Sequence, residues 1–149
     1  MKRLLFFTLI IGMLAACSKD KFKTVPQVKI TSFGPSEVHK GQLIQLLATV
    51  TDKEGDVQDS VLVVRKRYNN ATLLSWDTVR NNIKNLGNPK KQEFELQVLF
   101  LYGELRPEVA PIQNLENADR GFSLGIIVVD KAGNRSEYVE SDKILLKKL

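Results

Sequence analysis

The chain has 149 residues, of which 43% are hydrophobic and 26% charged, a composition typical of one globular domain and too apolar for a disordered protein. It contains a single cysteine and a single histidine. A zinc site of Cys and His ligands, a disulfide framework and a Cys–His nucleophile pair are therefore almost excluded. The formal net charge is +5.

The first residues have the pattern of a secretory signal peptide. Lys2 and Arg3 precede an apolar run of 13 residues, 4–16, which ends at Cys17. Because a helix needs about 20 apolar residues to cross a bilayer, this run is too short for a comfortable membrane span. We expect residues 1–16 to be removed, which leaves a net charge of +3 and argues against nucleic acid as a partner.

The tetrapeptide at the end of this run, Leu14-Ala15-Ala16-Cys17, resembles the lipobox of bacterial lipoproteins. The resemblance implies cleavage before Cys17 and a diacylglyceryl group on its thiol, so that residues 17–25 form a lipidated tether. Two or more acyl chains hold a protein stably on a membrane. The alternative is an ordinary secreted protein with a cysteine at this position by chance.

The residues after Cys17 bear on the choice of membrane. In lipoproteins of this kind an Asp directly after the cysteine is typical of inner-membrane retention, and Ser18 stands there instead. The resemblance therefore implies the outer membrane. Residues 18–21 also resemble the surface-export tag of Bacteroidota lipoproteins, although a solvated tether explains them equally well. The periplasmic and the cell-surface side both stay open.

Beyond the tether, apolar and polar residues mostly alternate with a period of two between clusters of Gly, Pro, Asn and Asp, which is typical of β-strands. Gly34-Pro35 interrupts the first strand, and Asn69-Asn70 predicts a tight hairpin because Asn tolerates positive φ. Seven strands are expected, at about 27–31, 43–51, 57–68, 71–79, 94–102, 122–129 and 137–146.

This number and spacing of strands predicts an all-β fold, an antiparallel β-sandwich of about seven strands in a single domain of residues 26–149. Segments such as 35–38 and 130–136 resemble bacterial immunoglobulin-like and fibronectin type III-like domains. The strand at 122–129 is expected to be central and covered on both sides, because Ile127 adds an apolar side chain to its other face. The expected core residues are Phe94, Leu96, Val98, Phe100, Phe122, Leu124, Ile126 and Val128.

Four carboxylates are candidate metal ligands. Asp52, Glu54 and Asp56 alternate in one turn, and Asp130 is expected at the same end of the sandwich. Because Ca²⁺ takes six to eight oxygen ligands, this set makes Ca²⁺ the one candidate cofactor. The competing interpretation is that no cofactor is bound and that tight turns simply favour Asp and Gly, with Lys53 offsetting the charge.

Two connections are long for such a domain, and long loops are often functional. Residues 80–92 carry basic and no acidic side chains, which suits anionic glycans or lipid headgroups but also suits a solvated loop. Residues 103–120 carry apolar side chains that either dock a partner or cap the sandwich. The basic candidates are Arg80, Lys84, Lys90 and Lys91, and the apolar ones are Leu105, Val109, Ile112 and Leu115.

Two aromatic residues near the predicted hairpin are candidate ligand contacts. Trp76, together with Tyr68, would form a sugar-stacking platform if both lie on an exposed sheet face. The alternative is packing in the core, where most large aromatic side chains lie.

Catalytic motifs are missing from the sequence: it has no Gly-x-Ser-x-Gly elbow, no glycine-rich phosphate loop and no His-Glu-x-x-His. We therefore expect no enzyme, but a membrane-anchored extracytoplasmic lipoprotein that acts as a non-catalytic binding or structural module for a protein or glycan partner. The alternative is an accessory subunit or a carboxylate-based hydrolase with a loop calcium site, using Asp52, Asp56 and Asp130.

Overall fold

The computed structural model describes residues 22–57, 60–82, 91–113 and 117–149. These ranges fold into strands joined by turns and loops, and they contain no helix of the length and hydrophobicity that a membrane span requires. The expected signal peptide, residues 1–16, and the expected lipidation site, Cys17, lie outside the described residues.

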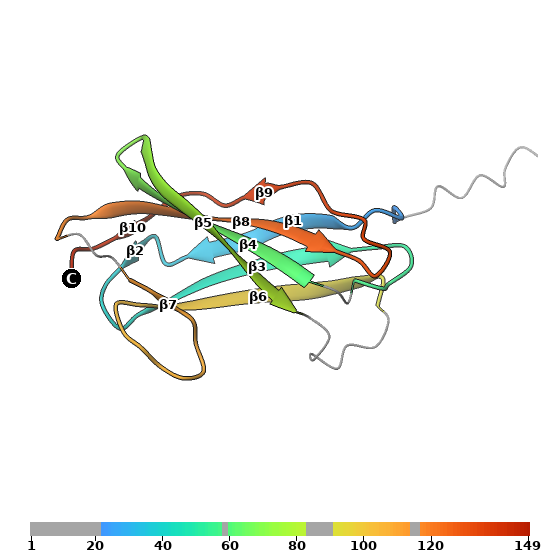
Figure 1. Ribbon diagram of the computed structural model, residues 1–149, viewed down its shortest axis with the longest axis horizontal. Helices are drawn as coiled ribbons and strands as arrows, with labels where there is room; N and C mark the ends of the chain where they lie inside the picture. The colour runs from blue at the N-terminus through green and yellow to red at the C-terminus, as the bar shows by residue number, and fades with distance from the viewer. Residues whose placement is uncertain (1–21, 58–59, 83–90, 114–116) are drawn as a thin grey trace, which may run out of the picture.

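The described strands form two sheets that stack as two layers (Figure 1). All pairs of long strands are antiparallel, and only the short pairs β2·β10 and β6·β7 are parallel. The expected all-β, immunoglobulin-like sandwich is therefore confirmed, with two mixed sheets.

Each sheet has its strands in the following spatial order. The four-stranded sheet contains β1 (Gln27–Gly34), β3 (Leu43–Thr51), β6 (Glu93–Tyr102) and β7 (Pro111–Ile112). The six-stranded sheet contains β2 (Glu37–Val38), β10 (Ile144–Leu146), β8 (Arg120–Val129), β4 (Ser60–Asn69) and β5 (Thr72–Asn82), with β9 (Val139–Glu140) paired to β8.

The core lies between the two sheets and is made by alternate residues of the long strands. In β3, every second residue from Ile44 to Val50 is fully buried, because successive side chains of a strand point to opposite faces. Seven of the eight expected core residues are buried, and Phe94 is half-buried against the same cluster. The period-two pattern therefore identified the inner faces of β6 and β8 correctly.

The C-terminal region differs from the prediction. The strand expected at 137–146 is two short strands, β9 and β10, which pair with successive parts of β8 and leave residues 141–143 between them. There the Ser141 hydroxyl accepts a hydrogen bond from the N–H of Leu124 at 3.0 Å. A side chain thus takes the place of one backbone acceptor and interrupts the strand.

The strand β8 is central and covered on both faces, as the sequence predicted. It lies between β10 and β4, and its inward-facing residues belong to the core. On its outer face the ring of Tyr138 covers Gly125, where an added Cβ would lie 2.1 Å from the ring. Only glycine leaves room for the tyrosine at this position.

Candidate functional site

Three carboxylates meet at one end of the sandwich. Asp52 follows the last residue of β3, Asp56 lies in the turn before β4, and Asp130 follows the last residue of β8. One carboxylate oxygen of each lies within 4.8 Å of those of the other two. Asp52 and Asp130 are only 1% and 2% exposed, whereas Asp56 is partly exposed. Strand ends from both sheets therefore bring the three groups together.

The hydrogen bonds of this cluster leave one buried oxygen without a partner among the described residues. The carboxylate of Asp130 accepts two hydrogen bonds from Asn134, one from its backbone N–H at 2.8 Å and one from its side-chain amide at 2.7 Å. The Oδ2 atom of Asp52 accepts the N–H of Asp56 at 3.2 Å, but its Oδ1 atom is buried with no partner among the described residues.

The environment of Asp52 disfavours its charged form. Burial raises the pKa of the Asp52 carboxyl, and the nearby negative charges of Asp56 and Glu54 raise it further, although the N–H of Asp56 partly opposes this.

The backbone around the cluster connects several segments. The N–H of Asp52 donates to the carbonyl of Gln92 at 2.8 Å, and the N–H of Lys131 donates to the carbonyl of Asp56 at 3.3 Å. Gly55, with a φ of +63°, is buried where an added Cβ would lie 3.0 Å from the backbone of Lys91. The turn is therefore packed closely against the chain that enters β6.

The structure brings together three of the four carboxylates proposed from the sequence. Asp52, Asp56 and Asp130 form the cluster, whereas Glu54 is exposed and does not belong to it. The expectation that Asp130 shares one end of the sandwich with the turn is confirmed. Alternation along a turn did not place Glu54, because a turn lacks the fixed period of a strand.

A groove of about 500 Å³ lies where the β4–β5 hairpin faces the segment around β7. The hairpin stands out from the body of the sandwich (Figure 1). Trp76, 65% exposed, lines the groove together with Arg65 and Asp77, which form a two-pronged ion pair at 2.6 and 2.8 Å. Arg67 lines it as well and donates to the carbonyl of Gln113 at 3.3 Å.

The two aromatic residues proposed as a platform do not share a surface. Trp76 is exposed, but Tyr68 is only 8% exposed, and its hydroxyl donates to Glu140 at 2.9 Å. The prediction of a Trp76–Tyr68 pair is therefore wrong, since Tyr68 is used inside a polar cluster. Asn70, with a φ of 51°, forms the expected tight hairpin between β4 and β5.

The two long connections are shorter than the sequence suggested. Arg80 is not in a loop but in β5, opposite Leu62, and Lys91 is exposed ahead of β6. Lys84 and Lys90 lie outside the described residues. No cationic patch can therefore be assembled from the described residues of this region alone.

The second connection, after β6, contains β7. Ile112 in β7 is buried in the core, and Val109 is partly buried, which agrees with a loop that caps the sandwich. Leu105 is exposed, and Leu115 lies outside the described residues.

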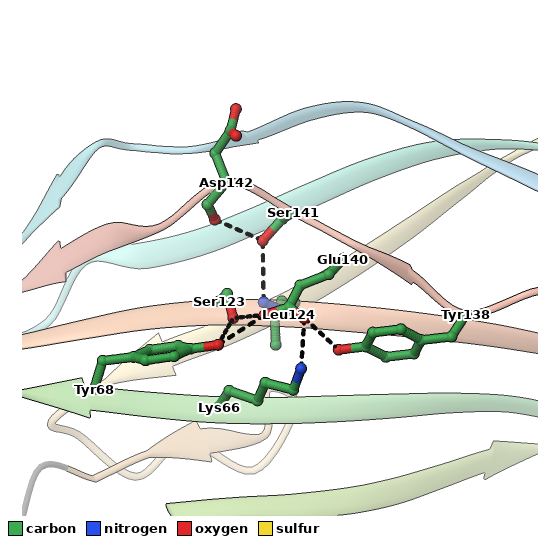
Figure 2. Close-up of polar contacts among 8 residues, drawn as sticks. All are labelled: Lys66, Tyr68, Ser123, Leu124, Tyr138, Glu140, Ser141 and Asp142. Atoms are coloured by element: carbon green, nitrogen blue, oxygen red, sulfur yellow. Dashed lines mark hydrogen bonds and ion pairs between the residues drawn. The ribbon is translucent and has the colours of Figure 1, made fainter. Parts of the chain in front are cut away.

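A polar cluster on the outer face of the six-stranded sheet was not foreseen from the sequence. Figure 2 shows Glu140 at its centre, with one oxygen accepting from Ser123 at 2.6 Å and Tyr68, and the other from Lys66 at 2.5 Å and Tyr138 at 2.8 Å. Burial alone raises the pKa of Glu140, but these four hydrogen bonds outweigh it and lower the pKa from 4.5 to about 2. The cluster holds the β9 segment onto β8 and β4.

No protein-family model and no curated protein matches this sequence. The structure is similar to Spo0M, a sporulation control protein from Bacillus subtilis, with 12% identity and a TM-score of 0.47 over 84% of this chain and 50% of that chain. The chain thus spans about half the length of Spo0M.

Two further likenesses are weaker in TM-score. A CARDB domain from Pyrococcus furiosus, solved in complex with di-metal ions, has 16% identity and a TM-score of 0.29 over 85% of this chain and 98% of that chain. A family 76 glycoside hydrolase from a bovine Bacteroides thetaiotaomicron strain has 14% identity and a TM-score of 0.34, and the match covers 80% of this chain and 20% of the hydrolase. Neither the metal ions of the one nor the activity of the other is carried over to this chain.

Proposed function

We propose that this chain is a membrane-anchored extracytoplasmic lipoprotein whose β-sandwich is a non-catalytic binding module. The charge order and length of the segment 1–16 support secretion, and the lipobox-like residues that end at Cys17 support a lipid anchor. Ser18, in place of an aspartate, supports the outer membrane. The lipid holds the module at a surface, and the sandwich carries the binding site.

Trp76, which is 65% exposed on the hairpin that borders a groove of mixed polarity, is the observation that supports binding most directly. An indole offers a flat apolar face that stacks on a sugar ring. Tryptophan side chains are highly buried on average, so a largely exposed one suggests a binding surface. The Arg65–Asp77 ion pair and Ser75 line the same groove and offer hydrogen-bond donors and acceptors. A volume of about 500 Å³ accommodates one or two sugar rings. We therefore take the partner to be a glycan of the cell envelope.

The carboxylate cluster gives the alternative, a hydrolase, little support. The two carboxylates of a glycosidase flank an open cleft at about 5 to 9 Å from each other, so that the sugar and, in inverting enzymes, a water fit between them. Asp52 and Asp130 are buried, and only Asp56 is partly exposed. These carboxylates therefore do not flank an open cleft in the way that a glycosidase pair does.

Trp76 is the only tryptophan of the chain, so its fluorescence reports on the hairpin beside the groove. We expect glycan fractions from the native envelope to change this emission with a saturable titration curve, and Trp76→Ala to abolish the binding heat measured by calorimetry. Leu105→Ala, an exposed apolar residue that does not line the groove, is the matched control and should bind normally. Emission that responds to envelope proteins and to no glycan would replace the glycan with a protein partner. No response to either would refute the binding site.

The anchor is tested separately. Metabolic labelling with a clickable fatty acid should label the wild type and not Cys17→Ala. Equal labelling of both, or a wild type that is soluble after cell fractionation, would show that the anchor is wrong.

A further inference from the structure

The cluster of Asp52, Asp56 and Asp130 is separate from the groove beside Trp76, and the function proposed above does not use it. Its carboxylates nominally carry three negative charges, with oxygens within 4.8 Å of one another. None of the three forms an ion pair with a residue that the structure describes. Carboxylates this close repel one another, and a bound cation or a shared proton relieves that repulsion.

A second observation points to a ligand. The Oδ1 atom of Asp52 is buried, and it accepts no hydrogen bond from the described residues. Leaving a buried polar oxygen without a partner is costly, and most such atoms in proteins are satisfied by protein groups, water or ions. The Oδ2 atom of the same carboxylate is already bonded to the N–H of Asp56. The Oδ1 atom therefore lacks a partner of the kind that a bound cation would supply.

We propose that Asp52, Asp56 and Asp130 bind one Ca²⁺ ion. Two oxygens bound to one calcium ion at about 2.3 to 2.6 Å are at most about 5 Å apart, and the separations observed here satisfy that limit. All three ligands are carboxylate oxygens, which suit a hard cation better than the softer ions Zn²⁺ and Cu²⁺. Mg²⁺ usually keeps several waters and takes one or two carboxylates, whereas Ca²⁺ accepts three carboxylates in an irregular arrangement.

The ion would join parts of the chain that are far apart in sequence. It would bridge the end of β3, the turn before β4 and the end of β8. The backbone of that turn also binds two other segments: Lys53 donates to the carbonyl of Lys23 at 2.9 Å, and Asp52 donates to that of Gln92. Lys23 belongs to the expected tether, so, with the anchor proposed above, calcium would fix the end of the sandwich that lies next to the membrane.

Direct binding to the full chain tests the proposal. The protein is purified in detergent, stripped with EGTA and titrated with CaCl₂ by calorimetry, with thermal unfolding measured in parallel. We expect one Ca²⁺ per chain, a Kd on the order of 10⁻⁴ to 10⁻³ M or tighter, as in extracellular modules, and a Tm raised by roughly 5 °C at saturating Ca²⁺. No binding heat and no change of Tm in a folded wild type would overturn the proposal, and would leave a shared proton as the explanation of the cluster.

Variants then locate the ion. Asp56→Asn is the first choice because Asp56 is partly exposed, and its replacement by an isosteric amide removes a charge without opening a cavity. It should weaken Ca²⁺ binding by about tenfold or more, whereas Glu54→Gln, an exposed carboxylate of the same turn outside the cluster, should bind Ca²⁺ as the wild type does. Equal weakening by both variants would mean diffuse attraction to an acidic surface and would refute a defined site.

Discussion

Replacing Glu140 by glutamine tests the polar cluster that holds the C-terminal segment onto the sheet. Glu140 accepts four side-chain hydrogen bonds, and its pKa falls from 4.5 to about 2. At about 1.4 kcal/mol per pH unit, this difference corresponds to about 3 kcal/mol of stability. The side chain is 27% exposed, so we reduce the expected loss on Glu140→Gln to about 2 kcal/mol at neutral pH.

The sign of the pH dependence follows from the lowered pKa. Because the folded state lowers the pKa of Glu140, its contribution is complete above about pH 4.5 and is lost as the pH falls towards 2. Urea unfolding followed by circular dichroism should therefore show that the wild type loses more stability than Glu140→Gln over this range. Glu137→Gln, on the same segment but outside the cluster, is the control and should follow the wild type. Equal acid dependence of the wild type and Glu140→Gln would refute the reasoning.

Three further changes test the packing by urea unfolding. Phe122→Ala should cost about 3 to 5 kcal/mol because the ring is fully buried between the sheets, and a loss below about 1 kcal/mol would contradict its place in the core. Gly125→Ala should cost about 1 to 3 kcal/mol by displacing Tyr138, with a changed near-ultraviolet tyrosine signal; an unchanged signal would show that the ring does not cover this glycine. Gly55→Ala should lower the free energy of unfolding more than Gly133→Ala does. Both glycines have positive φ, but of the two only Gly55 has backbone atoms within 4 Å of the added Cβ. The reverse order would argue against close packing of the turn.

The parts of the fold that the sequence predicts best are those decided by local alternation. In β6 and β8, apolar residues at every second position can be buried only if the strand faces a core, so strand and inner face follow together. The broken strand at 137–146 was missed because its break depends on the Ser141 hydroxyl, which bonds to a residue far away in the sequence. The two-residue strands β2 and β7 give no periodic signal at all.

The candidate sites also differ in whether local sequence predicts them. Asp52 and Asp130 could be placed at one end of the sandwich from the sequence, because each directly follows a long strand and the topology fixes where strands end. The polar cluster could not, since Lys66 and Glu140 are 74 residues apart and meet only through the register of β4, β8 and β9. The same register buries Tyr68, so the surface pair with Trp76 that the sequence left open does not form.

The most direct test of the central claim, that this sandwich is an anchored binding module, is a pull-down from its native membrane. The wild-type chain, Trp76→Ala and the control Leu105→Ala are each expressed at equal levels, crosslinked in intact cells and recovered with their partners. We predict that the wild type and Leu105→Ala recover the same envelope glycan, and that Trp76→Ala loses it while staying in the membrane fraction. An identical set of partners for all three chains would contradict the claim that the groove beside Trp76 is the binding site.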